Sequence, residues 1–170
     1  MSANVDFMSD KEIQRVTLGT RKSPGELIEA VDMASIPHGL NREIKALFKN
    51  ELVKVSDVVS HCDVLIVSNR ELGITHGSSF RSVSRRMRSR GLRLLNLEEV
   101  IEWFLVDDII GPGVGVLVAT VPLRLPSNRK RKFHLKTGVI GKSAKRFLGI
   151  RFIESHLQYR TTTLWACARM

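Results

Sequence analysis

Arginine is concentrated in one short stretch of this chain. Five arginines fall within ten residues, at Arg81, Arg85, Arg86, Arg88 and Arg90. The planar guanidinium group is permanently charged and presents paired N–H donors, a geometry that matches the oxygens of a phosphate group. The stretch therefore predicts contact with a polyanion, through phosphates rather than through a reactive centre.

A second set of cations lies between residues 129 and 151, in a part of the chain that is almost free of acids. Residues 109–170 contain twelve basic side chains, and Glu154 is their only acid. Internal neutralisation is therefore difficult, and an external polyanion is the favoured partner. The run 129–132 is also typical of a nuclear import signal. The candidate binding residues of this set are Arg129, Lys130, Arg131, Lys132, Lys136, Lys142, Lys145, Arg146 and Arg151.

Charge is segregated along the rest of the chain as well, within a net charge of +10. Residues 70–95 hold seven arginines against Glu71, and residues 96–108 hold five acids and no base. Because these opposite blocks are adjacent, residues 81–93 could be a solvated helix face that pairs with the acids of 96–108. For the arginine block 81–93, the sequence thus allows two interpretations: the arginines bind phosphates, or they pair with acids of the same chain.

Motifs for catalysis, metal binding or nucleotide binding are not evident. The segment 138–143 ends in Gly-Lys-Ser, but Lys136 stands where a phosphate-binding P-loop needs its first glycine. The five histidines are scattered, and Cys62 and Cys167 lie far apart with no second Cys or His pair to complete a zinc site. We therefore expect a protein that is not an enzyme, with no catalytic residue, metal ion or cofactor, and with two ordinary thiols.

The arginine stretch is expected to form a basic amphipathic helix that ends near Arg90. Ser79 is placed to cap the helix, and Gly91 is placed to end it. The spacing of Phe80, Val83 and Met87 directs these three side chains to the core and leaves the arginines outside.

Further elements are expected on both sides of this helix. Ser23 and Asn41 are expected to cap two helices, and residues 63–67 are expected to form a strand. Asn96 and Glu99 resemble a capping box, and the helix that follows should turn Glu98, Glu102 and Asp108 outward.

After Gly111 the chain becomes β-rich, with strands expected at 114–125, 133–140, 147–157 and 161–168. Pro122 and Pro126 should limit the first of these strands to an edge or an exit of the sheet. The fold class expected is α+β, with a mixed region 1–108, which contains the Arg-rich helix, and a β-rich basic region 109–170. The two regions could equally form one continuous domain.

The apolar stretch 109–123 is too short to span a bilayer, and no secretory signal is visible. We therefore expect an intracellular protein, in the cytoplasm or the nucleus.

Three functions compete for this pattern of charge. The first is non-enzymatic nucleic-acid binding through phosphates, with RNA or a single strand favoured over duplex DNA. The second is DNA regulation, because residues 72–75, 82–86 and 91–92 resemble a helix-turn-helix or winged-helix sequence. Five extra residues lie between Thr75 and the position where the second helix usually begins. The third is action at an anionic membrane surface or in assembly, with self-association. In size, basicity and alternating blocks the chain resembles small viral matrix or movement proteins; this resemblance is to a general type and assigns no role to any residue.

Overall fold

The computed structural model describes residues 12–33, 38–40, 42–49, 53–106, 110–111, 113–125, 128–140, 145–153 and 157–170. Within these residues the chain forms four helices, which are α2 (Pro24–Met33), α3 (Arg42–Lys49), α4 (Phe80–Ser89) and α5 (Leu97–Val106). The strands are β1 (Ile13–Leu18), β2 (His38–Leu40), β3 (Ser60–Ser68), β4 (Leu92–Arg93), β5 (Gly115–Leu125), β6 (Asn128–Ile140), β7 (Lys145–Phe152) and β8 (Leu164–Arg169).

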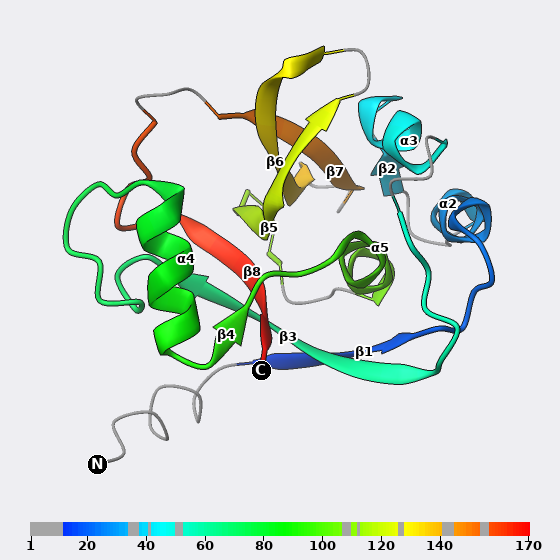
Figure 1. Cartoon of the computed structure of the whole chain (residues 1–170), viewed down its shortest axis with the longest axis horizontal. Helices are drawn as coiled ribbons and strands as arrows, with labels where there is room; N and C mark the ends of the chain where they lie inside the picture. The colour runs from blue at the N-terminus through cyan, green and yellow to red at the C-terminus, as the bar shows by residue number, and fades with distance from the viewer. Residues whose placement is uncertain are drawn as a thin grey trace.

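The strands form one mixed sheet in the order β1-β3-β8-β5-β6-β7-β2, and β4 also pairs with β8 (Figure 1). Most neighbours are antiparallel, whereas β5 with β8 and β2 with β7 are parallel. Strands from both regions of the chain share this sheet, because β8 pairs with β3 on one side and β5 on the other. The expected α+β class is confirmed.

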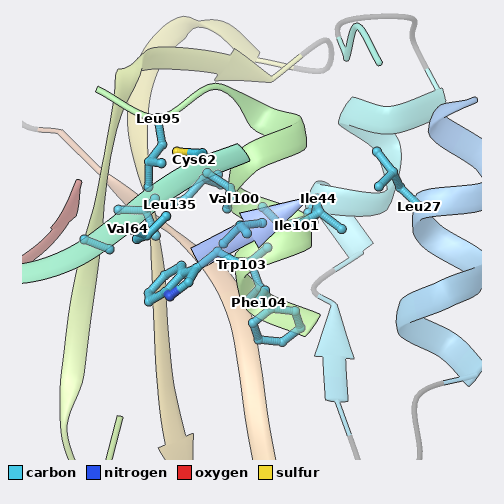
Figure 2. Packing of buried hydrophobic residues seen from close by; sticks show 14 of the residues in the cluster. Leu27, Ile44, Cys62, Val64, Leu95, Val100, Ile101, Trp103, Phe104 and Leu135 are labelled. Carbon is cyan, nitrogen blue, oxygen red and sulfur yellow. The ribbon is translucent and has the colours of Figure 1, made fainter. Parts of the chain in front are cut away.

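The helices lie on two sides of the sheet. Along β5, Val116 and Val118 belong to the hydrophobic cluster that α2, α3 and α5 complete, while Leu117 and Ala119 belong to the cluster beneath α4. Figure 2 shows side chains of α5 between the sheet and the two helices α2 and α3. Each sheet face therefore has its own apolar core, and α4 is the only described helix in the core of its face.

The helix caps expected from the sequence are confirmed where the structure describes them. Ser23 Oγ accepts a hydrogen bond from Glu26 N, and Ser79 Oγ accepts one from Ser82 N. In the capping box, Glu99 N donates to Asn96 Oδ1 at 2.9 Å while Asn96 N donates to Glu99 Oε2 at 2.8 Å. Gly91 has φ +72°, as expected for the residue that ends α4. Asn41 lies outside the described residues.

The outward orientation expected for Glu98 and Glu102 is wrong. Both side chains are buried, with 3% and 5% of their surface exposed. Glu98 accepts backbone hydrogen bonds from Gly19 and Ser56, so the two carboxylate oxygens satisfy donors that α5 covers. Helical periodicity alone cannot anticipate these partners, because they come from distant parts of the chain.

The apolar stretch after Gly111 contributes a strand to the interior of the sheet. β5 lies between β8 and β6, and Leu117 and Val118 form register pairs with both of these strands. Pro122 lies in the register shift between Val118 and Leu123, beyond the residues that β8 pairs. Pro122 thus lies where the strand has left β8, in agreement with the expected exit, whereas the first half of β5 lies inside the sheet. Pro126 lies outside the described residues. No helix among the described residues is long and apolar enough to cross a membrane.

Candidate functional site

The exposed side of α4 consists of arginine and serine. Val83 and Met87 are completely buried against the sheet, and Phe80 packs against the same cluster. The opposite side of the helix must therefore point to solvent. The arginines exposed there are Arg81, Arg85, Arg86 and Arg88. Arg90 is half-buried at the C-cap and has an interaction partner of its own.

The four exposed guanidinium groups have no acidic partner among the described residues. The acids of α5 are engaged elsewhere: Arg93 binds Glu99 through two hydrogen bonds of 2.6 and 2.9 Å, and Arg21 pairs with Glu102. Among the described residues, the contacts given show internal pairing between the arginine block 81–93 and the acidic block at Arg93. Asp107 and Asp108 lie outside the described residues.

Two cations from the second set lie on the same side of the sheet as α4. The ring of His134, on β6, lies 4.3 Å from the ring of Phe80, so this side of β6 faces the start of α4. Strand alternation places Lys136 on that side too, and Arg151 is the register partner of His134 on β7. Lys136 and Arg151 are both exposed. The tertiary structure therefore brings part of the second basic set next to the arginine helix.

The structure describes the side chains of two other cations in the second set. Lys132 is exposed, and strand alternation places it on the same side of β6 as His134. Arg146 is only 9% exposed, lies on the opposite side of β7 and has an interaction partner. Burial leaves little of Arg146 for an external ligand. The side chains of Arg129, Lys130, Arg131 and Lys145, and the whole of Lys142, are outside what the structure describes.

A polar cavity adjoins the arginine helix. Its volume is about 270 Å³, and it lies between α4 and the loop that precedes it. Guanidinium groups, hydroxyls and an imidazole converge on it, which are the donors that bind phosphate oxygens. The lining side chains include Thr75, His76, Ser78, Ser82, Arg85 and Arg86. Sequence reasoning missed the first four as binding residues, although hydroxyl residues before and at the start of a basic helix were a usable signal.

A buried aromatic cluster fixes α4 to the sheet. His134, Tyr159 and Trp165 pack edge to face beneath Phe80, with ring centroids 4.9 to 5.7 Å apart. Trp165 Nε1 donates to Asn69 Oδ1 at 3.0 Å. Burial, together with the nearby charge of Arg151, lowers the pKa of His134 to about 4, and burial raises the pKa of Tyr159 to about 12. The cluster is therefore uncharged at neutral pH, and it supports the helix on the sheet.

Metal ligands do not gather within the described residues, where no group of three or more His, Cys, Asp or Glu side chains could hold an ion. Cys62 and Cys167 are both buried and unpaired with each other, as expected for ordinary thiols. Burial raises the pKa of Cys62 to about 12, which opposes formation of the thiolate.

No protein-family model, curated protein sequence or solved structure matches this chain. The functional proposal therefore rests on the charge, burial and shape of the surface around α4.

Proposed function

We propose that this protein is a non-enzymatic nucleic-acid-binding protein that holds RNA or another single strand through its phosphates. The binding surface consists of the exposed arginines of α4, the adjoining polar cavity, and the cations of β6 and β7 on the same side of the sheet. We refer to this set as the α4 surface; its cations are Arg81, Arg85, Arg86, Arg88, Lys136 and Arg151.

The observation that carries the proposal is the lack of internal partners for the α4 arginines among the described residues. A guanidinium group that is exposed and unpaired keeps its charge and its donors available for an anion. Several such groups on one helix can contact several phosphates of a nucleic-acid backbone at once. The cations Lys136 and Arg151 lie on the same side of the sheet as the helix and add to the positive charge there.

The chemistry of the α4 surface favours binding without base specificity. Its exposed helix positions carry arginine and serine, which bond phosphate oxygens, and carry no asparagine or glutamine, the usual readers of adenine. Arginine also contacts guanine, so any residual base preference of α4 would be for guanine. Residues 69–79, which precede α4, contain no helix. The two-helix unit that a helix-turn-helix regulator inserts into the major groove is therefore not formed here.

Membrane insertion is a weaker candidate because the apolar stretch is not free to insert. Val116, Leu117, Val118 and Ala119 are all buried in the sheet. Exposing them to lipid would require β5 to leave its neighbours on both sides. An anionic membrane surface remains a competitor that the experiment has to include.

The test is binding of labelled single-stranded RNA, duplex DNA and anionic vesicles over a series of salt concentrations. Six phosphate contacts predict a log–log salt slope of about −4 for a single strand. Salt-sensitive binding of single-stranded RNA without sequence preference supports the proposal. Equal or stronger binding of vesicles, selection of one duplex sequence, or no binding at low salt each contradicts it.

A matched pair of variants locates the surface. Replacing Arg85 and Arg88 by glutamine should make the slope of log affinity against log salt shallower by about 1.4, because two phosphate contacts are removed. The control replaces Lys22 and Arg42 by glutamine; both are exposed, and they belong to the segments around α2 and α3, on the other side of the sheet. Equal effects of the two double variants would mean that net charge, not the α4 surface, governs binding.

A further inference from the structure

A second cavity opens on the α4 side of the sheet, between β5, β6, β7 and the turn before β8. Its volume is about 530 Å³, within the range of pockets that hold small molecules. Its lining combines apolar, cationic and hydroxyl side chains, and includes Leu117, Lys136, Phe147, Arg151, Thr162 and Thr163. We call it the β7 pocket.

One part of the β7 pocket is apolar and aromatic. Phe147 is half-buried, and its register partner on β6 is Gly138. A Cβ atom at Gly138 would lie 3.1 Å from the Phe147 ring and 2.7 Å from the carbonyl oxygen of Val114, so glycine at this position leaves room for the ring. Gly138 thus serves packing, although it begins the segment that ends in Gly-Lys-Ser. Leu117, which is buried with 5% of its surface exposed, adds an apolar edge to the pocket.

The other part of the pocket is cationic. Lys136 Nζ lies 5.9 Å from the centroid of the Phe147 ring, which holds the ammonium group at the pocket. Gly149 is opposite Lys136 in register, and a Cβ atom there would lie 3.7 Å from Lys136 Cε, in ordinary contact. Arg151 supplies the second charge. None of the described residues that line the cavity is acidic.

The hydroxyls of Thr162 and Thr163 complete the lining, and no described side chain or backbone group bonds them. The backbone of Thr163 is fixed at both ends of its peptide, because its carbonyl accepts from Asn69 N and its N–H donates to Arg160 O, each at 3.0 Å. The backbone at Thr163 is therefore fixed before any ligand arrives, which reduces the entropy lost on binding.

We propose that the β7 pocket takes one unstacked nucleobase of a single strand, with the adjoining phosphate on Lys136 and Arg151. This inference rests on the proposed function and sharpens it. A ligand for this lining must offer both a flat apolar group for Phe147 and a negative charge, and a nucleotide unit offers both. A base inside a duplex cannot enter, so the pocket selects single strands. Arg151 lies next to His134, whose ring contacts Phe80 of α4. A nucleic-acid strand bound in the pocket would therefore continue toward the arginine helix.

The experiment compares an RNA oligonucleotide with an abasic oligonucleotide of the same length and charge, and with the duplex form. The variant Phe147→Leu removes the ring and keeps an apolar side chain. The control is Phe152→Leu, because Phe152 is also half-buried on β7 but packs against the cluster on the other side of the sheet. The wild-type protein should bind the base-bearing strand about tenfold more tightly than the abasic strand. Phe147→Leu should remove this difference, and Phe152→Leu should keep it.

Each outcome separates the pocket from the wider proposal. Equal, salt-sensitive binding of intact and abasic strands overturns the β7 pocket and leaves phosphate binding by α4 intact. Absence of binding to every strand overturns the proposed function itself. The remaining probe is uridine monophosphate, whose binding is measured with and without the competing oligonucleotide. Weak binding that the oligonucleotide displaces supports the inference. Tight binding that the oligonucleotide does not displace assigns the pocket to a free nucleotide and overturns the inference.

Discussion

Acid should destabilise this protein through His134, and the size of the effect follows from its surroundings. The imidazole is completely buried among the rings of Phe80, Tyr159 and Trp165, and the charged group that acts on it is Arg151. Burial disfavours the protonated ring, and the guanidinium repels it. The pKa of His134 is therefore about 4 in the folded protein, compared with 6.5 in an unfolded chain.

The direction of the change in stability with pH depends on which state binds the proton. Above pH 6.5 the ring is neutral in both states, and His134 makes no pH-dependent contribution. Between pH 6.5 and 4 the unfolded chain binds a proton that the folded protein does not, so the free energy of unfolding decreases as the pH falls. The difference in pKa, at about 1.4 kcal/mol per pH unit, corresponds to about 3 kcal/mol. This is a large part of the stability of an ordinary domain.

Urea unfolding at pH steps from 7.5 to 4.5, followed by circular dichroism, measures this loss. His134→Phe retains an aromatic ring and cannot titrate, so the variant should lose about 3 kcal/mol less than the wild-type protein over this range. Carboxylates titrate in both proteins, and their effects cancel in the comparison. Parallel curves for the two proteins would refute the reasoning. If the variant does not fold, the pKa of His134 measured by NMR in the wild-type protein decides, and a value near 6.5 would also refute it.

Two further predictions concern stability, both measured by urea unfolding. Glu98→Ala should lower the free energy of unfolding by about 2 to 4 kcal/mol, because two backbone N–H groups lose their acceptor. The control is the exposed Glu29→Ala, which should lower it little; equal losses would contradict the role of the buried carboxylate. Gly19→Ala should destabilise the protein more than Gly91→Ala. Both glycines have positive φ, but only at Gly19 would a Cβ atom meet backbone, 2.4 Å from Val58 O. A smaller loss for Gly19→Ala would show that the clash is relieved.

Local sequence signals predicted α4 well. The cap at Ser79, the apolar spacing of Phe80, Val83 and Met87, and the stop at Gly91 all act within one short segment, so no distant partner is needed to read them. The exposed arginines follow from the same spacing.

The acidic helix shows where local signals fail. Glu98 and Glu102 lie at positions that favour solvent by periodicity alone, yet they are buried because donors from residues 19–21 and 56 reach them. These donors are more than 40 residues away in the chain, and only the folded topology brings them to α5. The sequence therefore left open whether the acids neutralise the arginine helix. In the fold, the carboxylates of Glu98, Glu99 and Glu102 bind partners outside α4.

The sequence by itself determined the charge blocks, the basic helix and the arginines that the helix exposes, because these depend on composition and on the short-range geometry of a helix. Only the tertiary structure decided which cations share a surface. Strand alternation and register place Lys136 and Arg151 beside α4 and turn Arg146 to the opposite side, and a change of one residue in register would reverse this choice. Register depends on pairing between strands that are distant in the chain, which is why the β7 pocket and the aromatic cluster appear only in the fold.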